Sequence, residues 1–247
     1  MALGDHRSGS GGDRHRRSVL VRVHPELAAT PRDGERYGVD VSAHQGEIDW
    51  RRVAADDIRF AYIKASEGGD FTDPGFRTNW AAAGEAGLER GAYHFFTLCR
   101  PGDEQARHFL AVAAPDPHAL APAVDLELAG NCRRRPSAPD ALANLHTFLQ
   151  IIETAWGQPA LLYVRDDWEN RYPVETALNR PLWQFRFLRR PNQNNVRVWQ
   201  IHGCAHVEGI TGQVDLNIMR VTSTRRSLGS NSQDLWIGVS RDLLITS

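Results

Sequence analysis

Short apolar segments alternate with amphipathic stretches along the chain from Tyr37 onward. Segments of this length and composition, bounded by Gly, Pro and Asp, are typical of buried β-strands. Eight segments fit this description: Tyr37–Val41, Phe60–Lys64, Gly91–Phe96, Ala121–Leu128, Ala160–Val164, Pro181–Phe185, Val196–Ile201 and Gln213–Leu216.

Three of the intervening stretches carry helix signals. Asp73-Pro74 places a capping carboxylate before a proline at the first helical position, and Gly87 stands at the far end. Ser137–Trp156 begins with a residue that caps helices and is followed by Gly157, a typical helix stop. A third helix is expected over Glu104–Ala113.

The spacing of the strands predicts the architecture. Successive strand markers lie 24 to 36 residues apart between Asp40 and Tyr163, but only 15 to 20 residues apart from Tyr163 to Asp215. The longer gaps accommodate a crossover helix, whereas the shortest barely do, so some late connections are expected to be hairpins with antiparallel strands. We therefore predict an α/β fold: a single-domain, irregular TIM-like barrel, regular in its first half and degenerate in its second.

Outside the strands, composition changes at both ends of the chain. Residues 1–36 are rich in Gly, Ser, Arg and Pro, which predicts a flexible leader before a barrel over 37–220 and a C-terminal extension over 221–247. No apolar run approaches the length of a membrane span, and the leader has no apolar stretch typical of an export signal.

The balance of charged residues excludes one class of function. With 29 basic and 30 acidic residues, the formal net charge is −1, which excludes a uniformly basic nucleic-acid binder. Lys64 is the single lysine in the sequence. Three cysteines are too few for a disulfide scaffold; Cys99 and Cys132 follow neighbouring strands, and their pairing remains open.

Acidic residues gather at predicted strand ends, where barrel enzymes place their chemistry: Asp40, Asp125, Glu127 and Asp215. Asp125 and Glu127 alternate with apolar neighbours and so point to the same side, with Cα atoms about 6.7 Å apart. One such motif usually caps a helix or meets solvent. Several in one barrel mouth favour an active site, because repulsion and burial raise at least one pKa and create a proton donor beside a carboxylate. Cleavage of a glycosidic bond requires this combination.

Other side chains near the same ends are candidates for binding a sugar. We expect contacts from Tyr93, Tyr163, Trp183 and Gln200, and hydrogen bonds from His44 and His94. Tyr62 and Trp199 are expected in the core. An alternative metal site could use His202 and His206 around Cys204, but the glycine-interrupted sequence between them disfavours it.

Several motifs, in order along the chain, resemble glycoside hydrolase family 25, the Chalaropsis-type lysozymes. They are Gly38-Val39-Asp40-Val41-Ser42, Tyr62-Ile63-Lys64-Ala65-Ser66-Glu67-Gly68, Gly91-Ala92-Tyr93-His94-Phe95-Phe96, Asp125-Leu126-Glu127, Val198-Trp199-Gln200 and Val214-Asp215-Leu216-Asn217. The resemblance covers most of the chain, from about Tyr37 to Arg220, and implies a (β/α)5(β)3 barrel. It also implies cleavage of the β-1,4 bond between N-acetylmuramic acid and N-acetylglucosamine in peptidoglycan.

The resemblance further implies roles for individual residues. Glu127 matches the general acid/base, and Asp125 the carboxylate that attacks the anomeric carbon or stabilises the substrate acetamido group. Asp40 and Asp215 match the other acidic positions. Tyr93 and Tyr163 match aromatic positions that line the groove. Glu67 lies in the matching signature and is expected to contact the substrate and to pair with Lys64. His44 departs from the pattern, because Tyr or Trp is usual there.

These observations lead to a set of expectations about function. We expect a monomeric hydrolase that acts on peptidoglycan at the cell wall, with no cofactor, no metal, no nucleic-acid partner and no membrane span. Two alternatives stay open: a barrel that binds peptidoglycan without cutting it, and a metal-dependent carbohydrate hydrolase using His202 and His206.

Overall fold

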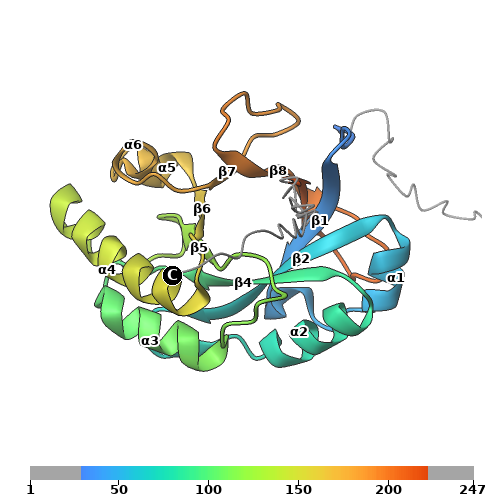
Figure 1. The fold of residues 1–247 in the computed structure, drawn as a ribbon, viewed down its shortest axis with the longest axis horizontal. Coiled ribbons are helices and arrows are strands. Elements are labelled where there is room, and N and C mark those ends of the chain that lie inside the picture. Colours follow the sequence, from blue (N-terminus) through green and yellow to red (C-terminus); the bar gives the residue numbers. More distant parts are fainter. Residues whose placement is uncertain (1–28, 222–247) are drawn as a thin grey trace, which may run out of the picture.

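The computed structural model describes residues 29–221, which form a closed barrel of eight strands with helices around part of its outer face (Figure 1). The strands are β1 (Glu35–Val41), β2 (Ile58–Glu67), β4 (Glu89–Phe95), β5 (Ala123–Leu126), β6 (Leu161–Val164), β7 (Leu182–Phe185), β8 (Val196–Ala205) and β9 (Val214–Arg220). Seven of these eight strands are parallel to one another, and β9 is antiparallel to its neighbours β8 and β1. The pairing of β1 with β2 closes the barrel. A two-residue strand, β3 (Phe71–Thr72), pairs with the end of β2 outside this ring.

Helices cover the first half of the barrel and are reduced to single turns in the second (Figure 1). The longer ones are α1 (Trp50–Ala55), α2 (Phe76–Glu85), α3 (Gly102–Val112) and α4 (Ala138–Trp156). The short ones are the 3-10 turn η1 (Ala43–Gln45), α5 (Asp166–Glu169) and α6 (Val174–Ala177). From β7 onward no helix lies between the strands described.

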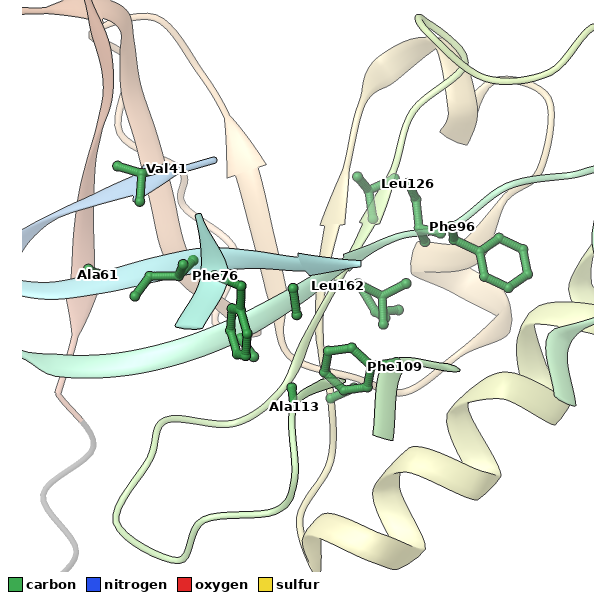
Figure 2. Packing of buried hydrophobic residues seen from close by; sticks show 14 of the residues in the cluster. Val41, Ala61, Phe76, Phe96, Phe109, Ala113, Leu126 and Leu162 are labelled. Carbon is green, nitrogen blue, oxygen red and sulfur yellow. The ribbon is translucent and has the colours of Figure 1, made fainter. Parts of the chain in front are cut away.

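Two apolar layers hold the barrel together. The larger lies between the outer face of the strands and the helices; Figure 2 shows Leu162 of β6 near Phe109 of α3. The smaller fills the inside of the barrel and contains Tyr62 and Trp183. Alternate residues of each strand face the outer and the inner layer. At one end of the barrel the inward-facing positions carry polar side chains.

The predicted strands are all confirmed, with ends that shift by a few residues. The antiparallel hairpin expected late in the chain is β8–β9. The prediction was wrong about the start of α2: Gly75 precedes the helix, because the Asp73 carboxylate accepts hydrogen bonds from the N–H groups of Gly75 and Ala43 (2.8 and 2.9 Å). Ser137 and Gly157 cap α4 as predicted.

The barrel begins slightly earlier than the predicted boundary at residue 37. Glu35 and Arg36 belong to β1, and Glu35 pairs with Arg190 (2.6 Å). The rest of the predicted leader and nearly all of the predicted extension lie outside the described residues. Within residues 29–221, no helix is both long and apolar enough to cross a membrane.

Candidate active site

A cavity of about 380 Å³ opens at the end of the barrel where the parallel strands finish. Its size is in the range of small-molecule sites. Its lining comprises Asp40, Tyr93, Ala123, Val124, Asp125, Glu127, Tyr163, Arg165, Trp183, Phe185, Gln200, Gly203 and Asp215. All four carboxylates singled out in the sequence therefore meet in one cavity.

Asp215 reaches this cavity by a different route from the other three. The sequence pattern predicted Asp215 at the end of its strand, but Asp215 is the second residue of β9. Because β9 is antiparallel to β1, its beginning lies at the end of the barrel where β1 finishes, and Asp215 is the direct partner of Asp40.

Asp125 and Glu127 form the first carboxylate pair, at the end of β5. The intervening Leu126 and the preceding Val124 are fully buried against the helix layer, so the alternation along the strand directs both acids inward. Burial raises the pKa of Asp125 well above its usual value, and the charge of Glu127 adds to this effect. Burial also raises the pKa of Glu127, against the opposing charge of Arg165. Asp125 Oδ1 is buried and has no hydrogen-bond partner among residues 29–221.

Asp40 and Asp215 form the second pair and are direct partners across β1 and β9. Asn217 Nδ2 donates to Asp40 Oδ1 (2.7 Å), and Asn217 Oδ1 accepts from Trp183 Nε1 (2.9 Å). Gln200 lines the cavity with Asp215 and opposes the rise that burial causes in the pKa of Asp215. Burial, followed by the charge of Asp215, raises the pKa of Asp40 well above its usual value. Burial therefore disfavours the ionised form of both carboxyl groups.

The aromatic side chains form the floor and wall of the cavity. The Trp183 ring packs against Tyr62 and Tyr163, with ring centroids 5.0 and 5.2 Å away. Burial raises the pKa values of Tyr93 and Tyr163, which keeps both phenols neutral. Tyr62 is in the core, as expected, and Trp199 packs on the other side of β8 with Ile201 and Ile218.

Three predicted contact residues lie elsewhere. His94 is completely buried behind β4, where it bonds to Ser66 (2.9 Å) and Gln105 (3.2 Å), and burial lowers its pKa to about 3. The prediction for His94 was wrong because it adjoins Tyr93, and neighbouring strand residues face opposite sides.

His44 and Glu67 do not line the cavity. His44 is exposed in η1 and its Nδ1 bonds to Ser42 Oγ (2.9 Å). Glu67 accepts a hydrogen bond from Lys64 Nζ (2.8 Å), which is the expected pair. A bulge at Ala65 shifts the register of β2 between these two residues.

The histidines of the alternative metal site do not assemble one. His202 Nδ1 accepts the N–H of Cys204 (2.9 Å), whose side chain is exposed. In the part of the chain that the structure describes, no three His, Cys, Asp or Glu side chains are grouped as metal ligands.

The loop after Glu127 is fixed to the neighbouring loop. Cys99 and Cys132 form a disulfide, which resolves the pairing left open by the sequence. Asn131 donates to the carbonyls of Phe96 (2.8 Å) and Glu127 (3.1 Å). These links restrict the backbone at Glu127.

Sequence reasoning missed three residues of the site: Arg165, Phe185 and Asn217. Each follows an identified inward residue by two positions, namely Tyr163, Trp183 and Asp215. The strand alternation that located Glu127 from Asp125 was thus available for them too.

Comparison with known proteins agrees with this architecture. Residues 39–210 match the model of glycosyl hydrolases family 25. The chain is 32% identical to the Escherichia coli K12 protein YegX, over 75% of this chain and 70% of that protein. It is 46% identical to lysozyme M1 of Streptomyces globisporus over 29% of this chain and 25% of that protein.

A solved structure shows the same fold over most of the chain. The family 25 glycosyl hydrolase from Bacillus anthracis superimposes with a TM-score of 0.71 at 27% identity, covering 79% of this chain and 94% of that one. The family model spans more than half of the sequence and includes three of the four cavity carboxylates. This chain therefore belongs to glycosyl hydrolase family 25.

Proposed function

We propose that this protein is a lysozyme-type muramidase that hydrolyses the β-1,4 bond between N-acetylmuramic acid and N-acetylglucosamine in peptidoglycan. The observation that carries the proposal is the buried, unpartnered Oδ1 of Asp125 beside Glu127 in an open cavity. A buried carboxylate oxygen without a partner is costly, so a ligand that donates a hydrogen bond to it is favoured. The acetamido N–H of an N-acetylated sugar supplies that donor.

Glu127 acts as the general acid in the first step. Its raised pKa retains the proton, which passes to the glycosidic oxygen as the bond from that oxygen to C1 breaks. Asp125 either attacks C1 or holds the acetamido N–H while the acetamido oxygen attacks C1. In both cases the hydrogen bond or charge that the substrate brings favours the ionised form of Asp125.

Glu127 acts as the base in the second step. Its carboxylate takes a proton from a water molecule whose oxygen attacks C1 and displaces the oxygen of Asp125 or of the acetamido group. This step releases the muramic acid hemiacetal and restores the protonated acid. Two displacements at C1 retain the β configuration. Asp40 and Asp215, with Asn217 bonded to Asp40, form the wall opposite the β5 pair.

The test is reducing-end release from purified peptidoglycan, with EDTA present, by wild type and Glu127→Gln. We expect wild-type activity in EDTA and a loss of about a thousandfold in the variant. Glu208→Gln is the matched control, because this exposed glutamate pairs with Arg52 away from the cavity.

Each alternative has its own outcome in this assay. Peptidoglycan binding without new reducing ends would support a non-catalytic barrel. Loss of activity in EDTA would support the metal-dependent hydrolase, and comparable turnover by Glu127→Gln would refute the role of Glu127.

A further inference from the structure

Arg165 brings a positive charge into a cavity that contains four carboxyl groups. It follows β6 directly and lines the cavity with Asp125 and Glu127. Its guanidinium lies over the Phe185 ring, 4.8 Å from the centroid. This contact holds the guanidinium in place without neutralising it.

The two acidic residues that follow Arg165 in the sequence are bound to other groups. Asp166 pairs with Arg186 (2.9 Å), and Asp167 Oδ2 accepts the N–H of Leu128 (3.2 Å). Among the ion pairs formed within residues 29–221, none includes Arg165. The other cation near the cavity, Lys64, is paired with Glu67 (2.8 Å).

The chemistry of a guanidinium limits what it can recognise. Arginine only donates hydrogen bonds, and its planar fork matches a carboxylate with two parallel bonds. Muramic acid differs from glucosamine by a lactyl ether at O3, and this group ends in a carboxyl. C3 adjoins C2, so a sugar whose acetamido group meets Asp125 brings its lactyl group close to that residue's neighbours.

We propose that Arg165 binds the lactyl carboxylate of muramic acid and makes the enzyme prefer glycan strands from which the stem peptides have been removed. The proposal rests on the muramidase function above. In peptide-bearing strands the lactyl group is an amide with one carbonyl oxygen, which accepts from the fork less strongly than a carboxylate. The preferred substrate would therefore be produced by an amidase that cleaves the bond between lactyl group and peptide.

The test uses peptide-free peptidoglycan strands in two forms. One carries free lactyl carboxylates; in the other, carbodiimide coupling with methylamine has converted them to neutral amides. For wild type we expect kcat/KM to be about ten- to a hundredfold higher on the carboxylate form. The ratio should fall close to one in Arg165→Gln and be intermediate in Arg165→Lys, which keeps the charge without the fork.

The matched control is Arg186→Gln, which removes a nearby arginine paired outside the cavity and should keep the wild-type ratio. Each variant is assayed at its own pH optimum, so that an effect of Arg165 on the carboxylates is separated from binding. An unchanged ratio in Arg165→Gln, or a wild-type ratio of one, would overturn the proposal and leave the muramidase function intact. Failure of wild type on both forms would instead overturn the muramidase function.

Discussion

The two carboxylate pairs of the cavity differ in how completely their hydrogen bonds are satisfied. Asp40 Oδ1 accepts a hydrogen bond from Asn217 Nδ2 (2.7 Å), which is itself bonded to Trp183. Asp125, on the opposite wall, keeps a buried oxygen without a partner. This difference indicates that the β1/β9 pair, Asp40 and Asp215, stabilises the cavity wall. The β5 pair, Asp125 and Glu127, is available to bind the substrate.

The largest expected difference between the pairs is in activity. Asp125→Asn removes the group that meets C1 or the acetamido N–H, and we expect kcat/KM on peptidoglycan to fall about a thousandfold. Asp40→Asn keeps an acceptor for Asn217 and a donor for Asp215, so its loss should be about ten- to a hundredfold. Equal losses in both variants would contradict the distinction between the pairs.

The framework role of the β1/β9 pair can be tested through Asn217. Asn217→Ala leaves both Trp183 Nε1 and Asp40 Oδ1 without this partner inside the barrel. The free energy of unfolding should fall by about 2 kcal/mol in urea titrations. Asn170→Ala, at an exposed position after α5, is the control and should change it by less than about 0.5 kcal/mol.

A smaller effect should appear in the pH dependence of stability. The pKa of Asp40 is higher in the folded chain than in the unfolded chain. Between these two pKa values the folded chain binds more protons, so the free energy of unfolding decreases as the pH rises from the lower value to the higher one. Asp40→Asn removes this contribution and should be more stable than wild type at pH 7, by on the order of 1 kcal/mol. The difference should vanish near pH 3, where both states are protonated; a variant less stable at pH 7 would contradict this.

The smallest effect concerns the alkaline limb of the activity profile. Activity should decline as pH rises through the raised pKa of Glu127, because the general acid loses its proton. Arg165 opposes that rise, so Arg165→Gln should move the limb to higher pH, while Arg165→Lys should move it less. A limb that moves to lower pH in Arg165→Gln would show that Glu127 is not the titrating acid.

Much of the fold could be predicted because each barrel strand has its own apolar segment. The eight strands and α4 with its two caps followed from local patterns. The start of α2 did not, because Asp73 bonds to Ala43, thirty residues earlier in the chain. Likewise, β3 has only two residues, both exposed, and shows no apolar pattern.

The residues of the site could be predicted where strand alternation was applied, and they were misplaced or missed where it was not. Alternation along the strand places Asp125 and Glu127 in one cavity. It also excludes His94 from the cavity, because Tyr93 faces inward. Applied to β6, it predicts that Arg165 faces the same side as Tyr163. The bulge at Ala65 and the disulfide between Cys99 and Cys132 depend on contacts between distant segments. So does the pairing of Asp40 with Asp215 across β1 and β9, which no local pattern encodes.

The most direct measurement is the identity of the sugar at the new reducing end. Peptidoglycan digested by wild type in EDTA is reduced with borohydride, hydrolysed, and analysed by mass spectrometry, beside a digest by Glu127→Gln. We predict muramitol from the wild-type digest and only background from the variant. Glucosaminitol in its place, or equal muramitol from both proteins, would contradict a muramidase that depends on Glu127.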